Sequence, residues 1–227
     1  MLEEKKIKMI YLKTGILWPH YEGKKAISAS FLTKLLKDVE YKNVPFHILQ
    51  KAATKGKMFH KAIQFFLHGK YKMIDDLKKT LSDEKLGKKI SDTIIFLKKV
   101  QFNYLDSEKL YYSFYKGTFL ATYIDLEFEK FVIELKTNRF TKKKSIILLI
   151  FEIQLLIQYI CTKKDIYILW NTGNEIIFNK FRTSKHLFKI LDMLIDLMCH
   201  RKEYSDDVKR QIVKKIFQIY NPSDIFF

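Results

Sequence analysis

Apolar residues in the first hundred positions recur three or four residues apart, which is the spacing of an α-helix. The longest such pattern covers about 47–67, and shorter ones cover about 73–81 and 90–100. Another begins at Phe31 directly after Ser30, whose hydroxyl is therefore the expected N-cap. This part of the chain is predicted to be a series of helices.

The centre of the chain is patterned differently. Segments 111–115, 119–128 and 131–135 are rich in aromatic and β-branched residues and lack the helical period, which favours strands. After a long apolar stretch come two short segments of the same kind, 166–170 and 176–178. We therefore predict three consecutive antiparallel strands, a helix, two further strands and two terminal helices, the second capped by Ser205.

These elements together predict an α/β fold. Its mixed sheet would have about four to five strands flanked by helices, with N-terminal and C-terminal helical additions. No internal repeat and no Pro- or Ser-rich linker divides the 227 residues. One domain is therefore expected over 1–227, with a core at about 27–180 and C-terminal helices at about 184–220.

The apolar segment 145–161 is flanked by lysines and superficially resembles a membrane span. It has only 17 residues and contains Glu152, Gln154 and Gln158, whereas a span needs about 20 apolar residues. A buried helix packed on the sheet is the better interpretation. Gln154 and Gln158 are four apart and share a face, which lies either in the interior or on the exposed side of a half-buried helix.

Charge favours a polyanionic partner. The chain has 42 Lys and Arg against 25 Asp and Glu, a net charge of +17, although 38 of the basic residues are Lys and part of the excess is compositional. The 48% hydrophobic content excludes a disordered polycation. Two cysteines cannot form a disulfide framework, and no secretory signal is apparent, so a cytoplasmic or other reducing, DNA-containing compartment is expected.

The hairpin around Glu129 and Lys130 carries the most informative chemistry. If these two residues form the turn, Asp125 lies directly opposite Glu134 with Cβ atoms about 5 Å apart, and Lys136 shares their face. Opposed carboxylates destabilise a sheet, so a divalent cation or the Lys136 ammonium is expected to compensate them.

These residues carry a family resemblance. An acidic residue on one strand, Glu134-Leu135-Lys136 on the next and a following helix with Gln154 and Tyr159 resemble the PD-(D/E)XK nuclease superfamily, in its RecB-like exonuclease branch. Further matches are Gly56 with His60 four residues later, the Ser-containing segment 27–30 and Gly117-Thr118. The resemblance covers about 27–170. The family spaces its Gln and Tyr four apart rather than five, so either Gln158 takes the Tyr place or the helix is distorted.

The resemblance implies a restriction-endonuclease-like core and a metal-dependent DNA nuclease. The activity would be exonucleolytic, in recombination, repair or phage-type DNA metabolism. It implies Mg²⁺ or Mn²⁺ held by Asp125 and Glu134, with His60 and the Leu135 carbonyl as further ligands. Lys136 would orient and help to deprotonate the attacking water. The residues expected to contact DNA or support the site are Gln154, Gln158, Tyr159 and Ser30.

Other functions are limited by what the sequence lacks. It contains no Walker-type Gly-Lys-Ser or Gly-Lys-Thr loop, so no ATP-driven motor is expected, and two cysteines cannot hold the four-cysteine iron–sulfur cluster of some family members. Two alternatives to a nuclease stay open. One is a catalytically inactive nucleic-acid-binding member of the same fold, and the other is a structural or membrane-surface protein.

Overall fold

The computed structural model describes residues 8–11, 17–21, 24–80, 83–100, 103–137, 145–200 and 203–220. Its helices are α1 (Ala29–Leu32), α2 (Lys34–Glu40), α3 (Phe46–Leu67), α4 (Tyr71–Thr80), α5 (Glu84–Lys99), α6 (Ser145–Thr162), α7 (Lys185–Cys199) and α8 (Asp206–Ile219). Its strands are β1 (Lys8–Tyr11), β2 (Leu17–Tyr21), β3 (Lys24–Lys25), β4 (Ile27–Ser28), β5 (Tyr104–Tyr115), β6 (Thr118–Phe128), β7 (Phe131–Lys136), β8 (Asp165–Asn171) and β9 (Ile176–Lys180). From α3 onward, this succession confirms the predicted order of elements.

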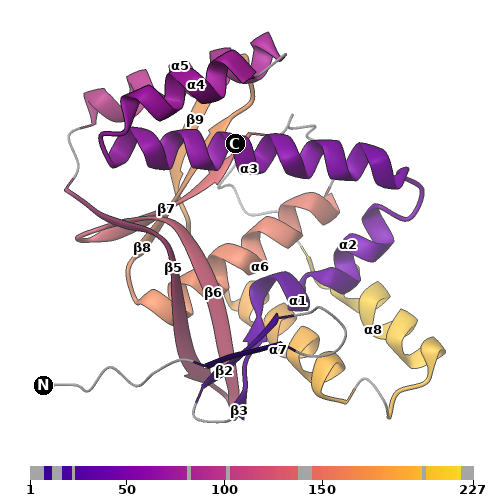
Figure 1. Ribbon diagram of the computed structural model, residues 1–227. Helices are drawn as coiled ribbons and strands as arrows, with labels where there is room; N and C mark the ends of the chain where they lie inside the picture. The colour runs from indigo at the N-terminus through magenta and orange to yellow at the C-terminus, as the bar shows by residue number, and fades with distance from the viewer. Residues whose placement is uncertain are drawn as a thin grey trace, which may run out of the picture.

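The main sheet is mixed and has six strands. Its order is β4-β6-β7-β8-β9, and β5 pairs with β6 (Figure 1). β5, β6 and β7 are antiparallel neighbours, β8 lies parallel to β7, and β9 is antiparallel to β8. The α/β class and the mixed sheet are thus confirmed, with one strand more than expected. The additional strand, β4, has only two residues and is too short to show a strand pattern.

The N-terminal part differs from the prediction. Ahead of the predicted helices, β1, β2 and β3 form a separate antiparallel sheet, which was not expected. Ser30 is not the N-cap, because β4 extends through Ser28 and the helix begins directly after it. The Ser28 hydroxyl accepts a hydrogen bond from the Phe31 N–H at 3.1 Å, and Ser30 lies exposed inside α1.

The C-terminal helices agree with the prediction. The expected additions are α7 and α8. The Ser205 hydroxyl caps α8 by accepting from the Val208 N–H, and Asp206 and Asp207 lie in the first turn, where carboxylates favour the positive end of the helix dipole.

Helices cover both faces of the sheet around β7 and β8 (Figure 1). Val132, Ile166 and Trp170 belong to the cluster with α6 and α7. Ile133 and Leu135 belong to the opposite cluster, with α3 and α5. Successive residues of β7 therefore point to opposite faces, as the alternation predicts, and the strand is buried between two helical layers.

α6 is the predicted core helix between β7 and β8. The side chains of Glu152 and Gln158 are fully buried, so the alternative in which the polar residues of this helix face solvent is wrong for both. Within the described ranges, no helix combines the length and the apolar character needed to cross a bilayer.

The two edges of β6 are paired differently, and the difference makes room for the site. β5 follows one edge over its whole length. The other edge pairs with β4 at Leu120 and Ala121 and with β7 at Leu126 and Glu127. On this edge, residues 122–125 have no strand partner, so their backbone is open to side chains from neighbouring elements.

The side chains of β6 also change from one face of the sheet to the other between Ile124 and Leu126. Leu120 and Ile124 belong to the cluster with α6, whereas Leu126 belongs to the cluster with α3, although all three have the same parity along the strand. Asp125 lies at the change. Opposite it on β5, between the pairs Ser107↔Leu126 and Lys109↔Ile124, Glu108 has a left-handed φ of 53°. Such a conformation costs about 1–3 kcal/mol in a non-glycine residue, so strain is stored beside Asp125.

Candidate functional site

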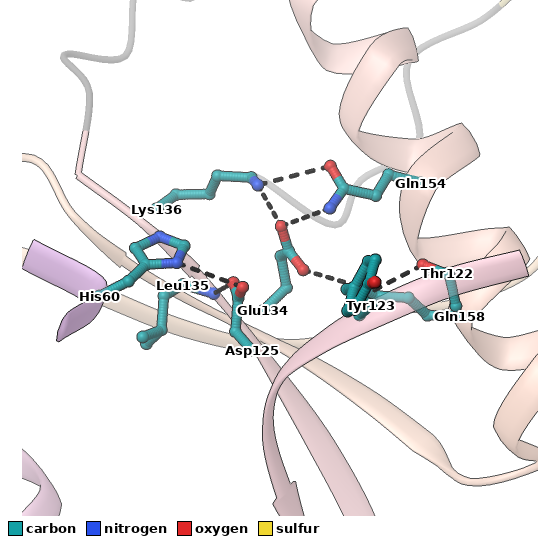
Figure 2. Close-up of polar contacts among 9 residues, drawn as sticks. All are labelled: His60, Thr122, Tyr123, Asp125, Glu134, Leu135, Lys136, Gln154 and Gln158. Atoms are coloured by element: carbon teal, nitrogen blue, oxygen red, sulfur yellow. Dashed lines mark hydrogen bonds and ion pairs between the residues drawn. The ribbon is translucent and has the colours of Figure 1, made fainter. Parts of the chain in front are cut away.

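The β6–β7 hairpin brings the two carboxylates together. Its pairs Leu126↔Ile133 and Glu127↔Val132 confirm the register expected of a two-residue turn at Glu129 and Lys130. The next position outward sets Asp125 opposite Glu134. There the Asp125 Oδ2 accepts a hydrogen bond from the Leu135 N–H at 2.8 Å, so a carboxylate occupies the fork between the two strands (Figure 2).

α3, which packs on the face of the sheet opposite to α6, supplies the imidazole of His60. Its buried residues Phe59, Ala62 and Ile63 pack in the cluster on the α3 face of the sheet, which fixes how the helix lies. His60 then points toward Asp125, with Nδ1 3.2 Å from Oδ1 (Figure 2). One turn earlier, a Cβ added at Gly56 would meet nothing within 4 Å, so the helix surface leading to His60 is open.

Glu134 is held by three nitrogen donors. Its Oε1 accepts from Gln154 Nε2 at 2.6 Å and from the Lys136 ammonium, and its Oε2 accepts from Gln158 Nε2 at 2.5 Å (Figure 2). Gln158 Nε2 also lies 3.3 Å from the carbonyl oxygen of Tyr123, in the part of β6 that pairs with neither β4 nor β7. Both α6 amides thus hold the carboxylate of Glu134, and Gln158 also contacts β6.

The side chain of Lys136 is mostly buried, and its ammonium lies at the site beside Glu134. Its side chain is 15% exposed, its ammonium lies 3.5 Å from Gln154 Oε1, and it lies 4.9 Å from the centre of the Phe151 ring. The cation–π contact and the bond to Glu134 hold the ammonium in one place. A lysine fixed in this way can donate a hydrogen bond to a reacting oxygen.

The two carboxylates differ electrostatically. Burial, and then the nearby Asp125, raises the pKa of Glu134 above the ordinary glutamate value. Burial also acts to raise the pKa of Asp125, but the charge and hydrogen bond of His60 outweigh burial and lower it. Burial lowers the pKa of His60, but Asp125 outweighs that effect and raises it. The contact between Asp125 and His60 therefore favours the charged form of each group, whereas the surroundings of Glu134 oppose its ionisation.

One site residue was missed by sequence reasoning. Lys37, on α2, is half-buried, and burial and then the Lys136 charge lower its pKa, while Glu134 acts in the opposite direction. Lys37 follows Leu36, which is fully buried, so it lies at the border of the apolar face of α2. That border position is a weak signal in the sequence, because 38 lysines share the chain.

Two predicted site residues lie apart from this group. Tyr159 is 38% exposed and follows Gln158 on a regular α6, so it is off the helix face that carries Gln154 and Gln158. These two amides, four positions apart, are the pair that reaches Glu134, as one of the two spacing alternatives predicted. Ser30 is exposed on α1, and its carbonyl accepts from Thr33 Oγ1 at 3.4 Å. A contact of the Leu135 carbonyl with a metal stays a prediction.

The donor chemistry suits a divalent cation. Two carboxylates and an imidazole come from three neighbouring elements, and the mutual repulsion of Asp125 and Glu134 is the feature that a cation would relieve. The three are not drawn into one cage, since Glu134 points to its nitrogen donors. Among the described residues, no three His, Cys, Asp or Glu side chains are close enough together to hold an ion.

Comparison with known proteins adds little. No family model and no curated protein matches the sequence. Among solved structures, one described as "Crystal structure of SSO0001" matches with 15% identity and a TM-score of 0.39, covering 78% of this chain and 76% of that chain. A likeness this slight carries no argument about fold or function.

Proposed function

We propose that this protein is a metal-dependent DNA nuclease with a restriction-endonuclease-like core. One observation carries the proposal: a buried Glu134 bonded to the Lys136 ammonium lies next to a second carboxylate, Asp125, at the fork of two strands. Such a group suits the hydrolysis of a phosphodiester, because the substrate is anionic and repels the nucleophile, and a cation held by the carboxylates would reduce that repulsion.

The polar interior of the site also favours a function over a structural role. Burying charged and amide groups costs free energy unless every group is paired, and repulsion between two carboxylates adds to that cost. Here Glu134 is 2% exposed and its pKa is raised by burial and by Asp125. Groups of perturbed pKa, held under strain and next to an open helix surface, are typical of catalytic sites.

Each residue has a role in the proposed reaction. Asp125, Glu134 and His60 would hold Mg²⁺ or Mn²⁺, which when bound neutralises phosphate charge and lowers the pKa of water. Lys136 donates a hydrogen bond to the attacking water and steadies the charge that develops on the phosphate. Gln154 and Gln158 keep the Glu134 carboxylate in one orientation.

The positive charge of the chain supports a nucleic-acid substrate. A net charge of +17 gives sequence-independent attraction to a phosphate backbone. We infer linear DNA as the substrate and cleavage from its ends, in recombination, repair or phage-type DNA metabolism. The two cysteines, Cys161 and Cys199, are free thiols, which fits a reducing compartment.

A degradation assay tests the proposal. The wild-type protein is expected to release nucleotides from linear DNA in Mg²⁺ or Mn²⁺ and to stop in EDTA. Lys136→Ala and Asp125→Asn should each lower the rate by about 10²–10⁴. Lys180→Ala, at an exposed pair with Asp165, is the matched control and should keep the rate. Equal rates in all four proteins, or none in the wild type, would contradict the proposal.

One observation favours a second candidate, a nucleic-acid-binding protein without catalysis. Both oxygens of Glu134 already accept hydrogen bonds from Lys136, Gln154 and Gln158. If these bonds hold in solution, Glu134 is unavailable to a metal. This candidate predicts salt-sensitive binding of DNA that Mn²⁺ does not alter and no cleavage by the wild-type protein.

A further inference from the structure

Tyr123 presents an aromatic ring to solvent in the middle of a packed strand. Of the eleven residues of β6, all of which the structure describes, Tyr123 alone is exposed, at 52%. Its neighbours Thr122 and Ile124 are 3% and 1% exposed. The strand is held in the protein on both sides of Tyr123, so the exposed ring is carried on a fixed backbone.

The backbone of Tyr123 is joined to the proposed site. Its carbonyl oxygen lies 3.3 Å from Nε2 of Gln158, and the same nitrogen donates to Glu134 Oε2 at 2.5 Å. One amide nitrogen therefore separates Tyr123 from the Glu134 carboxylate. In Figure 2 the side chain of Tyr123 lies on one side of Glu134, and His60 lies on the other.

Strand geometry shows where the ring stands. Tyr123 and Asp125 are two residues apart on β6, which is about 7 Å along the strand. Ile124 between them packs in the cluster with α6, so the side chain of Tyr123 points away from that helix. On β5, Leu110 lies directly opposite Tyr123 and Tyr112 lies diagonally, and both are half-buried. The ring thus stands beside the carboxylates with apolar neighbours from β5 within its reach.

The packing of the described residues makes no use of the Tyr123 side chain. Within the described ranges its hydroxyl makes no hydrogen bond and its ring contacts no other ring, and both of its side-chain hydrogen-bond partners, Thr122 and Gln158, donate to its backbone carbonyl. Tyr111 and Tyr115 on β5 instead each donate from the hydroxyl to a carboxylate. A tyrosine with a structural role is typically buried with its hydroxyl paired. The Tyr123 ring is therefore available to a ligand.

A nucleobase is the planar ligand that suits this position. If a backbone phosphate is bound at Asp125 and Glu134, the neighbouring parts of a nucleic acid are its sugars and bases. Bases stack on exposed aromatic side chains, and this contact tolerates any sequence because every base has a π-face. Inside a duplex the faces of the bases are covered by one another, so a base must be unpaired or displaced to reach a protein ring.

We propose that Tyr123 is a substrate-binding residue whose ring stacks on an unpaired base next to the phosphate at Asp125 and Glu134. The site therefore takes its DNA as a single strand. This inference rests on the proposed nucleic-acid substrate. The positive charge of the chain supplies sequence-independent attraction, and the stacked base sets the position of the strand relative to the carboxylates.

Stacking has a signature that a charge contact and a structural role lack. Loss of a ring releases no counterion, so it lowers affinity while the slope of log K against log salt stays unchanged. A residue that merely supports the fold would change the binding of single strands and duplexes alike. A loss confined to single strands, at constant slope, therefore identifies the role.

The test uses the full-length protein and three variants. Tyr123→Leu removes the ring, Tyr123→Phe keeps it, and Phe114→Leu removes a ring on β5 that is 62% exposed. Phe114 is a matched control because it pairs with Phe119, which lies about 20 Å before Asp125 along β6.

The measurement is equilibrium binding in EDTA at several salt concentrations. One probe is a labelled single-stranded oligonucleotide, and the other is a blunt duplex of the same sequence with G·C pairs at its ends. Melting curves identify folded variants, and Tyr123→Ile replaces the Leu variant if that one is unfolded.

Tyr123→Leu is expected to bind the single strand about ten-fold more weakly, with the wild-type salt slope, and to keep its affinity for the duplex. Tyr123→Phe and Phe114→Leu should keep both affinities. Unchanged single-strand affinity in Tyr123→Leu, a lower salt slope, or an equal loss on the duplex would overturn the inference. So would an equal loss in Tyr123→Phe or in Phe114→Leu.

The Tyr123 contact and the nuclease proposal can fail separately. Wild-type protein that binds DNA without cleaving it would defeat the nuclease proposal while leaving the Tyr123 contact standing. Cleavage by the wild type, together with unchanged binding by Tyr123→Leu, would defeat the contact alone. Wild-type protein that binds no DNA would defeat both.

Discussion

Two glutamates on the same hairpin are buried to nearly the same degree, but their pKa values are shifted in opposite directions. Glu127 on β6 is 3% exposed, and Glu134 on β7 is 2% exposed. Burial acts to raise both pKa values, but Lys164, Tyr111 and Lys109 outweigh it and lower the pKa of Glu127. The pKa of Glu134 stays raised, because Asp125 adds to the effect of burial.

The difference separates a structural carboxylate from a candidate functional one. Glu127 receives bonds from Tyr111, from Lys109 at 3.2 Å and from Lys164 at 2.7 Å, and Lys164 also donates to the Phe128 carbonyl at 2.8 Å. This group ties the hairpin to the segment after α6. Around Glu134, burial and the charge of Asp125 outweigh the Lys136 ammonium, and a bound cation would relieve this repulsion. Burial of an acid alone therefore does not identify a site, whereas uncompensated burial does.

Exchanging each glutamate for glutamine should give the largest contrast. Glu134→Gln is expected to lower DNA cleavage about 10³-fold, because a proposed metal ligand and the partner of Lys136 are lost. Glu127→Gln should keep the cleavage rate but lower the free energy of unfolding by about 2–3 kcal/mol, since two lysines lose their anion. Cleavage rates and urea unfolding measure both effects. A loss of activity in Glu127→Gln in folded protein would remove the distinction.

The two lysines on Glu127 should differ in their contribution to stability. Lys164 is 22% exposed and makes two hydrogen bonds, so Lys164→Met should lower the free energy of unfolding by about 1–3 kcal/mol. Lys109 is 48% exposed, and Lys109→Met should cost less than about 1 kcal/mol. Urea unfolding of both variants at low salt checks the order. Equal costs would mean that burial does not set the strength of these pairs.

The pH dependence of stability should have opposite signs for the two glutamates. The pKa of Glu127 is lowered on folding, so its contribution is present above the unfolded value of 4.5 and is lost as pH falls through the folded pKa. The pKa of Glu134 is raised, so its contribution is present below 4.5 and is lost as pH rises through the folded pKa.

Unfolding in EDTA across pH 3–7 tests these signs against the glutamine variants. The stability advantage of the wild type over Glu127→Gln should shrink as pH falls below about 4.5. Its advantage over Glu134→Gln should instead shrink as pH rises above about 4.5. Differences that stay constant with pH would show that neither carboxylate has a shifted pKa.

The smallest effect is expected at Tyr159. Its side chain is 38% exposed and off the face of α6 that reaches Glu134, so Tyr159→Phe should change the cleavage rate less than about two-fold. Gln158→Ala, one residue earlier, should lower it at least ten-fold, because a buried carboxylate oxygen loses its donor. Initial rates at saturating DNA compare the two. A larger loss in Tyr159→Phe would place the tyrosine in contact with substrate.

Much of the fold around the site follows from local patterns. A two-residue turn fixes the register of the hairpin, and strand alternation then puts Lys136 with Glu134 and Leu135 on the other face. Helical spacing of four puts Gln154 and Gln158 on one side of α6. These features depend on residues close together in sequence, so the sequence could predict them.

Other features depend on contacts between distant segments and were not predictable. β4 has two residues and exists because it pairs with β6, and Ser28 rather than Ser30 caps α1 because β4 extends to it. Lys37 comes next to the site through the packing of α2 on α6, which no local pattern encodes. The β1–β3 sheet likewise showed no strand pattern strong enough to predict.

Binding of Mn²⁺ to the metal-free protein tests the central claim most directly. Calorimetry at neutral pH compares the wild type with Asp125→Asn, Glu134→Gln and Glu127→Gln. The account predicts saturable Mn²⁺ binding by the wild type and by Glu127→Gln, and binding weakened at least ten-fold in the other two. Binding that is absent from the wild type, or unchanged by the substitutions at Asp125 and Glu134, would contradict it.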